Sequence, residues 1–328
     1  MTSVDKNRLD WIDVAKGIGI LLVIIGHCIF ICHPLIDVFH MPLFFLIAGI
    51  TFKYKSWDVF MISKINRIGI PYTFWMIVSS ILSIIPHPYS GPFNGPLWFL
   101  QTMFVAQIIV NFNWVGTNRV KILIILGLLA LYCFFSINRT LPDCLPFHIE
   151  RALMACFYII WGIFLSGFFK AKRTEFKCIL YAVVSCVFFA ISFIYLFSKG
   201  LNGTFIALTI YSHYYILVLL CSFAGIFATI FISQLIGRQS WLEWLGRNSL
   251  AIMCVHFPFA QILNVMISHM VWYNTIAGKV ILGLIEYAVV TGISVVLAIL
   301  CKRYIPRVTG YESLIHSERD TVPKTTIA

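Results

Sequence analysis

Long apolar runs alternate with short polar segments along almost the whole chain. A helix needs about 20 apolar residues to cross the roughly 30 Å hydrocarbon core of a bilayer, and about ten of the runs approach that length. The runs cover residues 14–33, 35–53, 68–86, 97–113, 120–137, 147–169, 178–198, 212–233, 248–268 and 278–301. The pattern therefore predicts an all-α, polytopic membrane protein with about ten transmembrane helices.

Basic residues distinguish the two sides of this predicted bundle. If the N-terminus is cytoplasmic, 20 of the 24 Lys and Arg residues fall on the inner side. The exceptions on the outer side are Arg139, Arg151, Lys199 and Lys279. Because cytoplasmic loops of membrane proteins carry an excess of Lys and Arg, we expect both the N-terminus and the C-terminus in the cytoplasm.

The composition agrees with a chain that is solvated largely by lipid. Of its 328 residues, 60% are hydrophobic and only 11% are charged, whereas soluble domains carry roughly 25% charged residues. We predict one transmembrane domain over residues 1–312, placed in the cell's inner (cytoplasmic) membrane. Residues 313–328 form a polar segment, which we predict to be a disordered cytoplasmic tail.

Neither the net charge nor the cysteine content points to another class of protein. The formal net charge is +11, but the basic residues lie between apolar runs and form no basic stretch interleaved with aromatics, so we expect no nucleic-acid partner. The chain has ten cysteines but no CxxC pair, and nine of the ten fall within or at the ends of apolar runs. Buried cysteine behaves as a small hydrophobe, so we expect no metal.

Ionisable residues inside a predicted span are costly and often functional, and the first span contains the main candidates. Lys16 and His27 are eleven residues apart, so a continuous helix would place them on one face within about 20° and about 16 Å apart along its axis. This face would present a cation near the cytoplasm and a base deep in the membrane, which suits a long anionic substrate. An ordinary i,i+3 ion pair between Asp13 and Lys16, with His27 bonding across the bundle, explains the same residues.

Further polar candidates lie at the ends of other predicted spans. Lys64 and Arg67 precede the third span, where the planar guanidinium of Arg67 suits a phosphate, although the positive-inside rule explains both equally well. Glu150 and Arg151 lie at the outer start of the sixth span. They form either a local ion pair or contacts to an acceptor.

Two other histidines fall within predicted spans. His40 is predicted at a depth similar to that of His27, and Pro42 after it would free backbone carbonyls. A histidine whose hydrogen bonds are satisfied near the interface is an equal explanation for His40. His256 lies in the inner half of the span 248–268, and we expect it to have a packing role.

The sequence resembles the membrane acyltransferase-3 family through several short motifs that occur in the family's order. They are Asp13-Val14-Ala15-Lys16-Gly17 with His27, the segments 39–49, 64–71 and 95–100, and Trp244 to Leu250 followed by His256. The first motif, a basic residue, ten residues and then a histidine, is the family's signature. Members of the family move acyl groups, mostly acetyl, onto carbohydrates and related acceptors.

The resemblance implies a role for each candidate. His27 would be the catalytic base that takes the proton of an acceptor hydroxyl, and Asp13 would position Lys16. An unperturbed histidine has a pKa of about 6.5, which suits a general base at neutral pH. The residues assigned to the phosphates of acyl-coenzyme A are Lys16, Lys64 and Arg67, and those assigned to substrate are His40, Trp98, Glu150 and Arg151.

The sequence also departs from the family pattern. Lys16 stands where arginine is commoner, which keeps the attraction for phosphate but loses the bidentate geometry. Ala48-Gly49 replaces the usual Ser-Gly, so a hydroxyl is missing there. No soluble esterase-like domain follows, so the whole transfer is expected within the membrane domain.

These observations lead to one expectation and two alternatives. We expect an O-acetyltransferase that uses acetyl-CoA as donor and modifies a sugar of a surface polysaccharide or of its lipid-linked precursor. The first alternative is a transporter or exporter of polysaccharide or acylated sugars. The second is an acyltransferase with another donor, such as succinyl-coenzyme A, or with a non-sugar acceptor. No sequence feature fixes the sugar or the oligomeric state.

Overall fold

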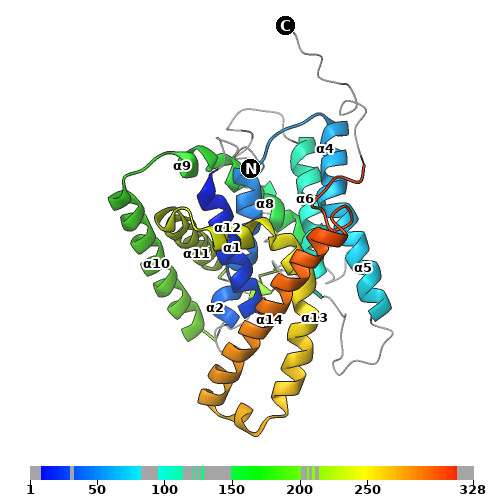
Figure 1. Ribbon diagram of the computed structural model, residues 1–328. Helices are drawn as coiled ribbons and strands as arrows, with labels where there is room; N and C mark the ends of the chain where they lie inside the picture. The colour runs from blue at the N-terminus through cyan, green and yellow to red at the C-terminus, as the bar shows by residue number, and fades with distance from the viewer. Residues whose placement is uncertain are drawn as a thin grey trace.

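The chain forms a bundle of helices in the computed structural model (Figure 1). The structure describes residues 9–29, 33–82, 95–113, 120, 124, 127–128, 149–200, 205–206, 209–210 and 214–315. In these ranges the regular structure is helical, apart from a ladder in which β1 (Phe205–Ile206) pairs antiparallel with β2 (Thr209–Ile210). The predicted helical fold class is confirmed.

The elements fall into two groups along the chain. The first comprises α1 (Asp10–Ile25), α2 (His33–Asp37), α3 (His40–Ile50), α4 (Trp57–Lys64), the π-helix η1 (Ile65–Gly69), α5 (Ile70–Leu82), the 3-10 turn η2 (Gly95–Leu97) and α6 (Trp98–Asn113). The second comprises α8 (Ile149–Phe164), α9 (Ser166–Lys170), α10 (Glu175–Ser198), α11 (Tyr215–Ile236), α12 (Ser240–Arg247), α13 (Ser249–Ser268), the 3-10 turn η4 (Val271–Asn274) and α14 (Ile276–Tyr304).

Five helical stretches in the described ranges are long and apolar enough to cross a membrane. They are His33–Ile50, α10, α11, α13 and α14. The last four lie close to the predicted spans 178–198, 212–233, 248–268 and 278–301. The predicted span 120–137 falls almost entirely outside the described residues, and the count of about ten spans and the cytoplasmic position of both termini stay predictions.

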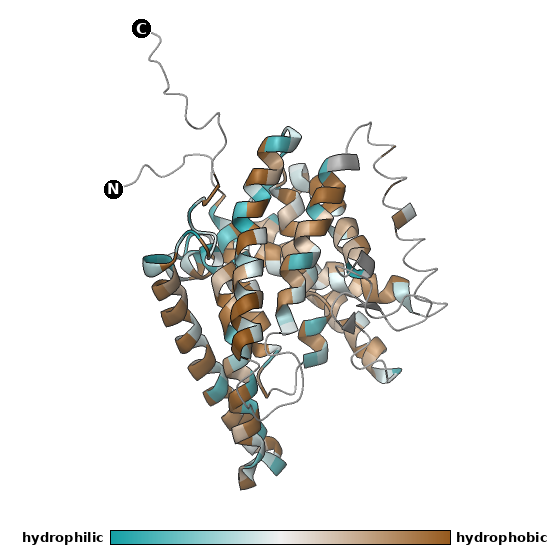
Figure 2. Cartoon of the chain, turned by 90° about the vertical axis from the view of Figure 1, so that its right-hand side faces the viewer, coloured by the Kyte–Doolittle hydropathy of each residue, from teal (hydrophilic) through white to brown (hydrophobic). Residues whose placement is uncertain are grey.

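The long helices consist mainly of hydrophobic residues, as Figure 2 shows, and many of these side chains are exposed. On α10, at the edge of the bundle in Figure 1, Phe176 is 73% exposed and Ile194 is 66% exposed. Water would make such a continuous apolar surface costly, because each large side chain left exposed forgoes about 1.5–3 kcal/mol of burial. Lipid is the solvent that this surface fits, so the chain is a multi-pass membrane protein.

Helix α1 lies inside the bundle and packs against α3, α11, α12, α13 and α14. Two glycines allow its closest approach, which is to α12. A Cβ atom on Gly17 would collide with the carbonyl of Leu242, and one on Gly246 would collide with the carbonyl of Asp13. Small residues let helix backbones come together in this way, and the approach carries the end of α12 to the wall of the site described below.

The prediction of one continuous helix over residues 14–33 is wrong. α1 ends at Ile25, and Gly26 to Ile29 form a turn with no further helix. His27 therefore follows the helix by two residues instead of sharing a helical face with Lys16.

The physical reason for the break is that other side chains satisfy the backbone of this turn. The hydrogen bonds run from His33 Nδ1 to Gly26 O at 2.7 Å, from Asn264 Nδ2 to His27 O at 2.9 Å, and from Ile29 N to Glu286 Oε2 at 2.7 Å. Irregular backbone at membrane depth is tolerated where protein groups replace the helical hydrogen bonds. Two of the partners come from α13 and α14, more than two hundred residues away in sequence.

Candidate functional site

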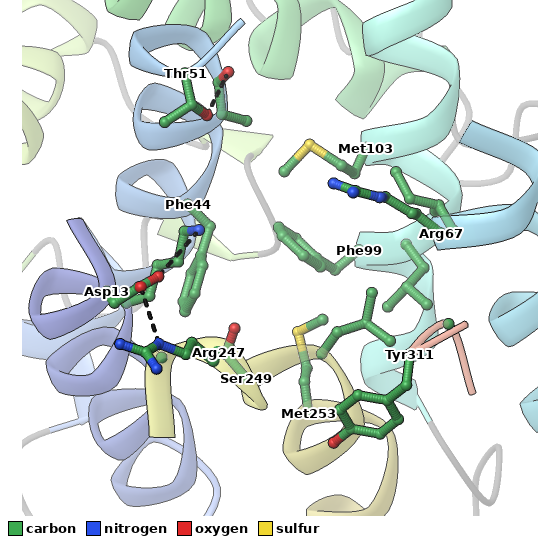
Figure 3. A pocket seen from close by; sticks show the side chains of 17 residues that line it. Asp13, Phe44, Thr51, Arg67, Phe99, Met103, Arg247, Ser249, Met253 and Tyr311 are labelled. Carbon is green, nitrogen blue, oxygen red and sulfur yellow. Dashed lines mark hydrogen bonds and ion pairs between the residues drawn. The ribbon is translucent and has the colours of Figure 1, made fainter. Parts of the chain in front are cut away.

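A cavity of about 410 Å³ opens beside the N-terminal half of α1. Its walls come from α1, α3, η1, α6, α12, α13 and the segment after α14. Four charged side chains line it, namely Asp13, Lys16, Arg67 and Arg247. Figure 3 shows Asp13 and Arg247 on one side of this first cavity and Arg67 on the other, with Phe44 and Phe99 between them.

Asp13 is the centre of the charge arrangement in the first cavity. It is only 2% exposed, and a buried carboxylate needs partners. Lys16 Nζ lies 3.9 Å from Asp13 Oδ1, and Arg247 Nε lies 3.3 Å from Asp13 Oδ2. Arg247 also contacts Glu243 at 2.5 Å. Asp13 thus fixes the positions of two cations at the cavity wall while leaving a net positive lining.

The two basic residues predicted before the third span do not act together. Arg67, in η1, is exposed and lines the first cavity, across from Asp13 and Arg247. Lys64 is not among the lining residues, and its Nζ lies 5.2 Å from the ring centroid of Phe60. Burial, and then the nearby charges of Arg67 and Lys55, lower the pKa of Lys64 to about 8.

A second cavity, of about 530 Å³, lies at the other end of α1. It is lined by Gly26, His27, Cys28, Ile29, His33, Gln261, Asn264, Tyr273 and Lys279. Its residues come from the turn after α1, from the first residue of α2, from α13, from η4 and from the start of α14, and none of them is acidic.

His27 and His256 are in contact, with ring centroids 5.2 Å apart. Phe257 packs on the other edge of His27 at 5.1 Å. His256 is completely buried, and its Nδ1 lies 2.8 Å from the carbonyl of Met253. A carbonyl only accepts, so this Nδ1 carries the hydrogen and the Nε2 of a neutral ring is an acceptor. Within the part of the chain that the structure describes, that Nε2 is buried without a hydrogen-bond partner.

The histidine pair lies between the two cavities. α1 lines the first cavity with Asp13 and Lys16, while Gly26 and His27 line the second. α13 lines the first cavity with Met253 and the second with Gln261 and Asn264, and His256 follows Met253 by one helical turn. His27 is thus accessible from the second cavity, and its partner His256 lies one helical turn from Met253 in the wall of the first.

His40 lies away from the linings of both cavities. His40 is buried at the start of α3, where its Nδ1 donates to the carbonyl of Ile36 at 2.8 Å. Its imidazole is close enough to His27 and His256 for a charge on one ring to act on the others. His40 is therefore near the pair, but it lines neither cavity.

Trp98 and Arg151 form a pair of their own. The guanidinium carbon of Arg151 lies 5.2 Å from a ring centroid of Trp98, a cation–π arrangement between α6 and α8. From the motif that contains Trp98, the side chains that line the first cavity are Phe99 and Leu100. The side chain of Glu150 lies outside the described part of the chain.

Several residues of this region were not foreseen from the sequence. Arg247 belongs to the motif Trp244 to Leu250, but its contact with Asp13 crosses more than two hundred residues. Glu286 is 1% exposed and holds the turn at Ile29, while its Oε1 lacks a partner among the described residues. A signal for Glu286 was available, because it is an acidic residue inside the apolar run 278–301.

The segment after α14 returns to the first cavity and closes one of its walls. Gly310 and Tyr311 line the cavity, and Gly310 has a φ of +82°, a conformation that favours glycine. The amide oxygen of Asn66 accepts from the backbone N–H groups of Leu314 and Ile315 at 2.8 and 2.9 Å. These hydrogen bonds hold residues 314 and 315, the start of the predicted tail, against η1, and the boundary at residue 312 stays a prediction. Residues 316–328 of the predicted tail lie outside the described residues.

Comparison with known proteins gives one match. A family model described as an acyltransferase domain matches residues 9–303, a range that contains every candidate residue of both cavities except Gly310 and Tyr311. No curated protein and no solved structure matches the chain significantly.

Proposed function

Since the chain belongs to the acyltransferase-3 family, we propose that it is a membrane O-acetyltransferase that takes the acetyl group of acetyl-CoA. The acceptor would be a hydroxyl of a sugar in a surface polysaccharide or in its lipid-linked precursor, at the cell's inner membrane. The observation that carries the proposal is the contact of His27 with His256 between two separate cavities. One cavity suits an anionic donor, and the other suits a hydroxylated acceptor.

The first cavity supports binding of the donor through its charge. Acetyl-CoA is long and carries several phosphate charges, and Lys16, Arg67 and Arg247 face the cavity as three cations. Arginine binds phosphate through two parallel N–H groups, while Lys16 adds a point charge. In this proposal the phosphates lie near these side chains, and the thioester arm extends along α1 towards His27.

The second cavity supports binding of the acceptor next to the base. In the proposed reaction, His27 accepts the proton of the acceptor hydroxyl as its oxygen forms a bond to the thioester carbonyl carbon. The carbon–sulfur bond then breaks, and the coenzyme A thiolate takes the proton from His27 to leave as a thiol. A neutral His256 has its Nδ1 hydrogen held by Met253 and packs against the ring of His27, which it positions.

The proposal is tested with the full chain in lipid nanodiscs. Radiolabelled acetyl-CoA is mixed with the cell's own lipid-linked glycan fraction, and label on the glycan is measured for wild type and for His27→Ala. We expect transfer by wild type alone, with unchanged binding of acetyl-CoA by the variant. Equal transfer by both proteins would remove His27 from the mechanism. No transfer by wild type, together with movement of saccharide across a bilayer, would favour a transporter.

A further inference from the structure

The second cavity contains polar groups that the proposed chemistry at His27 does not use. Asn264 donates its Nδ2 hydrogen to the carbonyl of His27 at 2.9 Å. Its Oδ1 is buried and has no hydrogen-bond partner in the ranges that the structure describes. A buried acceptor without a partner costs about 1–3 kcal/mol, and a hydroxyl of a bound ligand would remove that cost. Gln261, one turn earlier on α13, adds an amide to the same wall.

The lining also contains a cation, Lys279. Lys279 lies in the first turn of α14, and its Nζ is 5.1 Å from the ring centroid of Tyr273, which also lines the cavity. No carboxylate in the described part of the chain pairs with Lys279, and no residue of the lining is acidic. The positive end of the helix dipole of α14 adds to the potential at this position.

The cavity therefore combines three kinds of group around one space of about 530 Å³. A base and an amide oxygen suit hydroxyl groups, an aromatic ring suits the apolar face of a sugar, and an ammonium group suits an anion. A neutral sugar would leave the ammonium group without an anionic partner. An acidic sugar would use all three.

We propose that Lys279 selects acceptors that carry an anionic group near the hydroxyl that is acetylated. The inference rests on the proposed acetyl transfer at His27, and it names the chemical class of acceptor. The anion is a carboxylate of a sugar acid or a phosphate that joins a glycan to its lipid carrier. Lys279 binds the anion, Tyr273 packs on the sugar ring, and Asn264 Oδ1 accepts a hydrogen bond from a hydroxyl group.

The experiment compares variants on three probes in nanodiscs. The probes are methyl glucoside, methyl glucuronide and a polyprenyl-diphosphate-linked glucose, each tested with labelled acetyl-CoA. The variants are Lys279→Met and Lys279→Arg, with Lys199→Met as matched control. Lys199 is predicted on the same side and also lies over a tyrosine ring, with its Nζ 5.5 Å from the centroid of Tyr195. It lines neither cavity.

The expected result is a loss confined to anionic acceptors. Lys279→Met should raise the KM for an anionic probe about ten- to a hundredfold, the range of a charge-assisted hydrogen bond. Its KM for acetyl-CoA and its activity on methyl glucoside should stay unchanged. Lys279→Arg should retain most of the preference, and Lys199→Met should match wild type. A loss on the glucuronide alone assigns a carboxylate, and a loss on the lipid-linked probe alone assigns a phosphate.

Two results would overturn the inference. Wild type could transfer acetyl to all three probes with equal kcat/KM, or Lys279→Met could weaken all three equally. Direct titration of the two anionic probes keeps the test independent of the proposed function. If wild type transfers no acetyl but binds an anionic probe, and Lys279→Met does not, the acceptor class stands while the proposed reaction fails. If wild type binds neither anionic probe, the inference fails.

Discussion

Glu286 is predicted to keep His27 in place through the turn that follows α1. Its Oε2 accepts the N–H of Ile29 at 2.7 Å, and the side chain is 1% exposed. Glu286→Leu removes the acceptor and leaves the N–H of Ile29 buried without a partner. Glu286→Gln keeps an oxygen in the same place and is the matched control.

The size of the effect follows from the bond that is lost. A hydrogen bond to a charged group contributes about 1.5–3 kcal/mol, and a neutral one about 0.5–1.5 kcal/mol. Since about 1.4 kcal/mol corresponds to a factor of ten, Glu286→Leu should lower the fraction of molecules with a correctly placed His27 by about ten- to a hundredfold. Glu286→Gln keeps a neutral hydrogen bond that is about 1–1.5 kcal/mol weaker, so it should lose about five- to tenfold.

The assay measures kcat for acetyl transfer and, separately, the affinity for acetyl-CoA. The first cavity lies at the other end of α1, so both variants should bind acetyl-CoA as wild type does. A thermal unfolding midpoint in detergent separates a general loss of stability from a local change at the turn. The explanation is refuted if Glu286→Leu turns over like wild type, or if Glu286→Gln loses as much activity as Glu286→Leu.

Three further predictions concern the histidine pair and the first cavity. His256→Phe keeps an aromatic ring beside His27 but removes the Nε2 acceptor. The kcat should fall at least about tenfold, while the affinity for acetyl-CoA stays unchanged. An unchanged kcat would contradict a positioning role for His256. Lys16→Met should raise the KM for acetyl-CoA about tenfold, and Lys16→Arg should have the wild-type KM. Equal KM values for wild type and both variants would show that the phosphates bind elsewhere. Asn66→Ala removes the acceptor that holds Leu314 and Ile315, so limited proteolysis should cut the C-terminal segment faster, and an unchanged rate would show that other contacts hold it.

The helical fold was predictable because long apolar runs are a local property of the chain. α10, α11, α13 and α14 follow the predicted runs closely, since each run needs only lipid or other helices around it to form a helix. The pattern failed at Gly26 to Ile29, which lie in the same apolar run as the helix before them. The hydrogen-bond partners that replace the helical ones at this turn, Asn264 and Glu286, come from distant helices.

The site was predictable only in part, because contacts between residues far apart in the sequence leave no local pattern. Spacing along one helix linked Asp13 to Lys16, and their ion pair is present. No local pattern showed that Arg247 reaches Asp13 or that His256, to which we gave a packing role, contacts His27. Lys64 and Arg67 were predicted as one phosphate site, but the chain changes from α-helix to π-helix between them, and only Arg67 faces the first cavity.

The central claim is that His27 acts as the base for direct acetyl transfer from a donor in one cavity to an acceptor hydroxyl in the other. The most direct measurement uses proteoliposomes with a single orientation of the protein, labelled acetyl-CoA on one side and the glycan acceptor sealed on the other. Wild type should label the acceptor across the bilayer, and His27→Ala should not. Labelling that requires donor and acceptor on the same side, or that survives His27→Ala, would contradict the account.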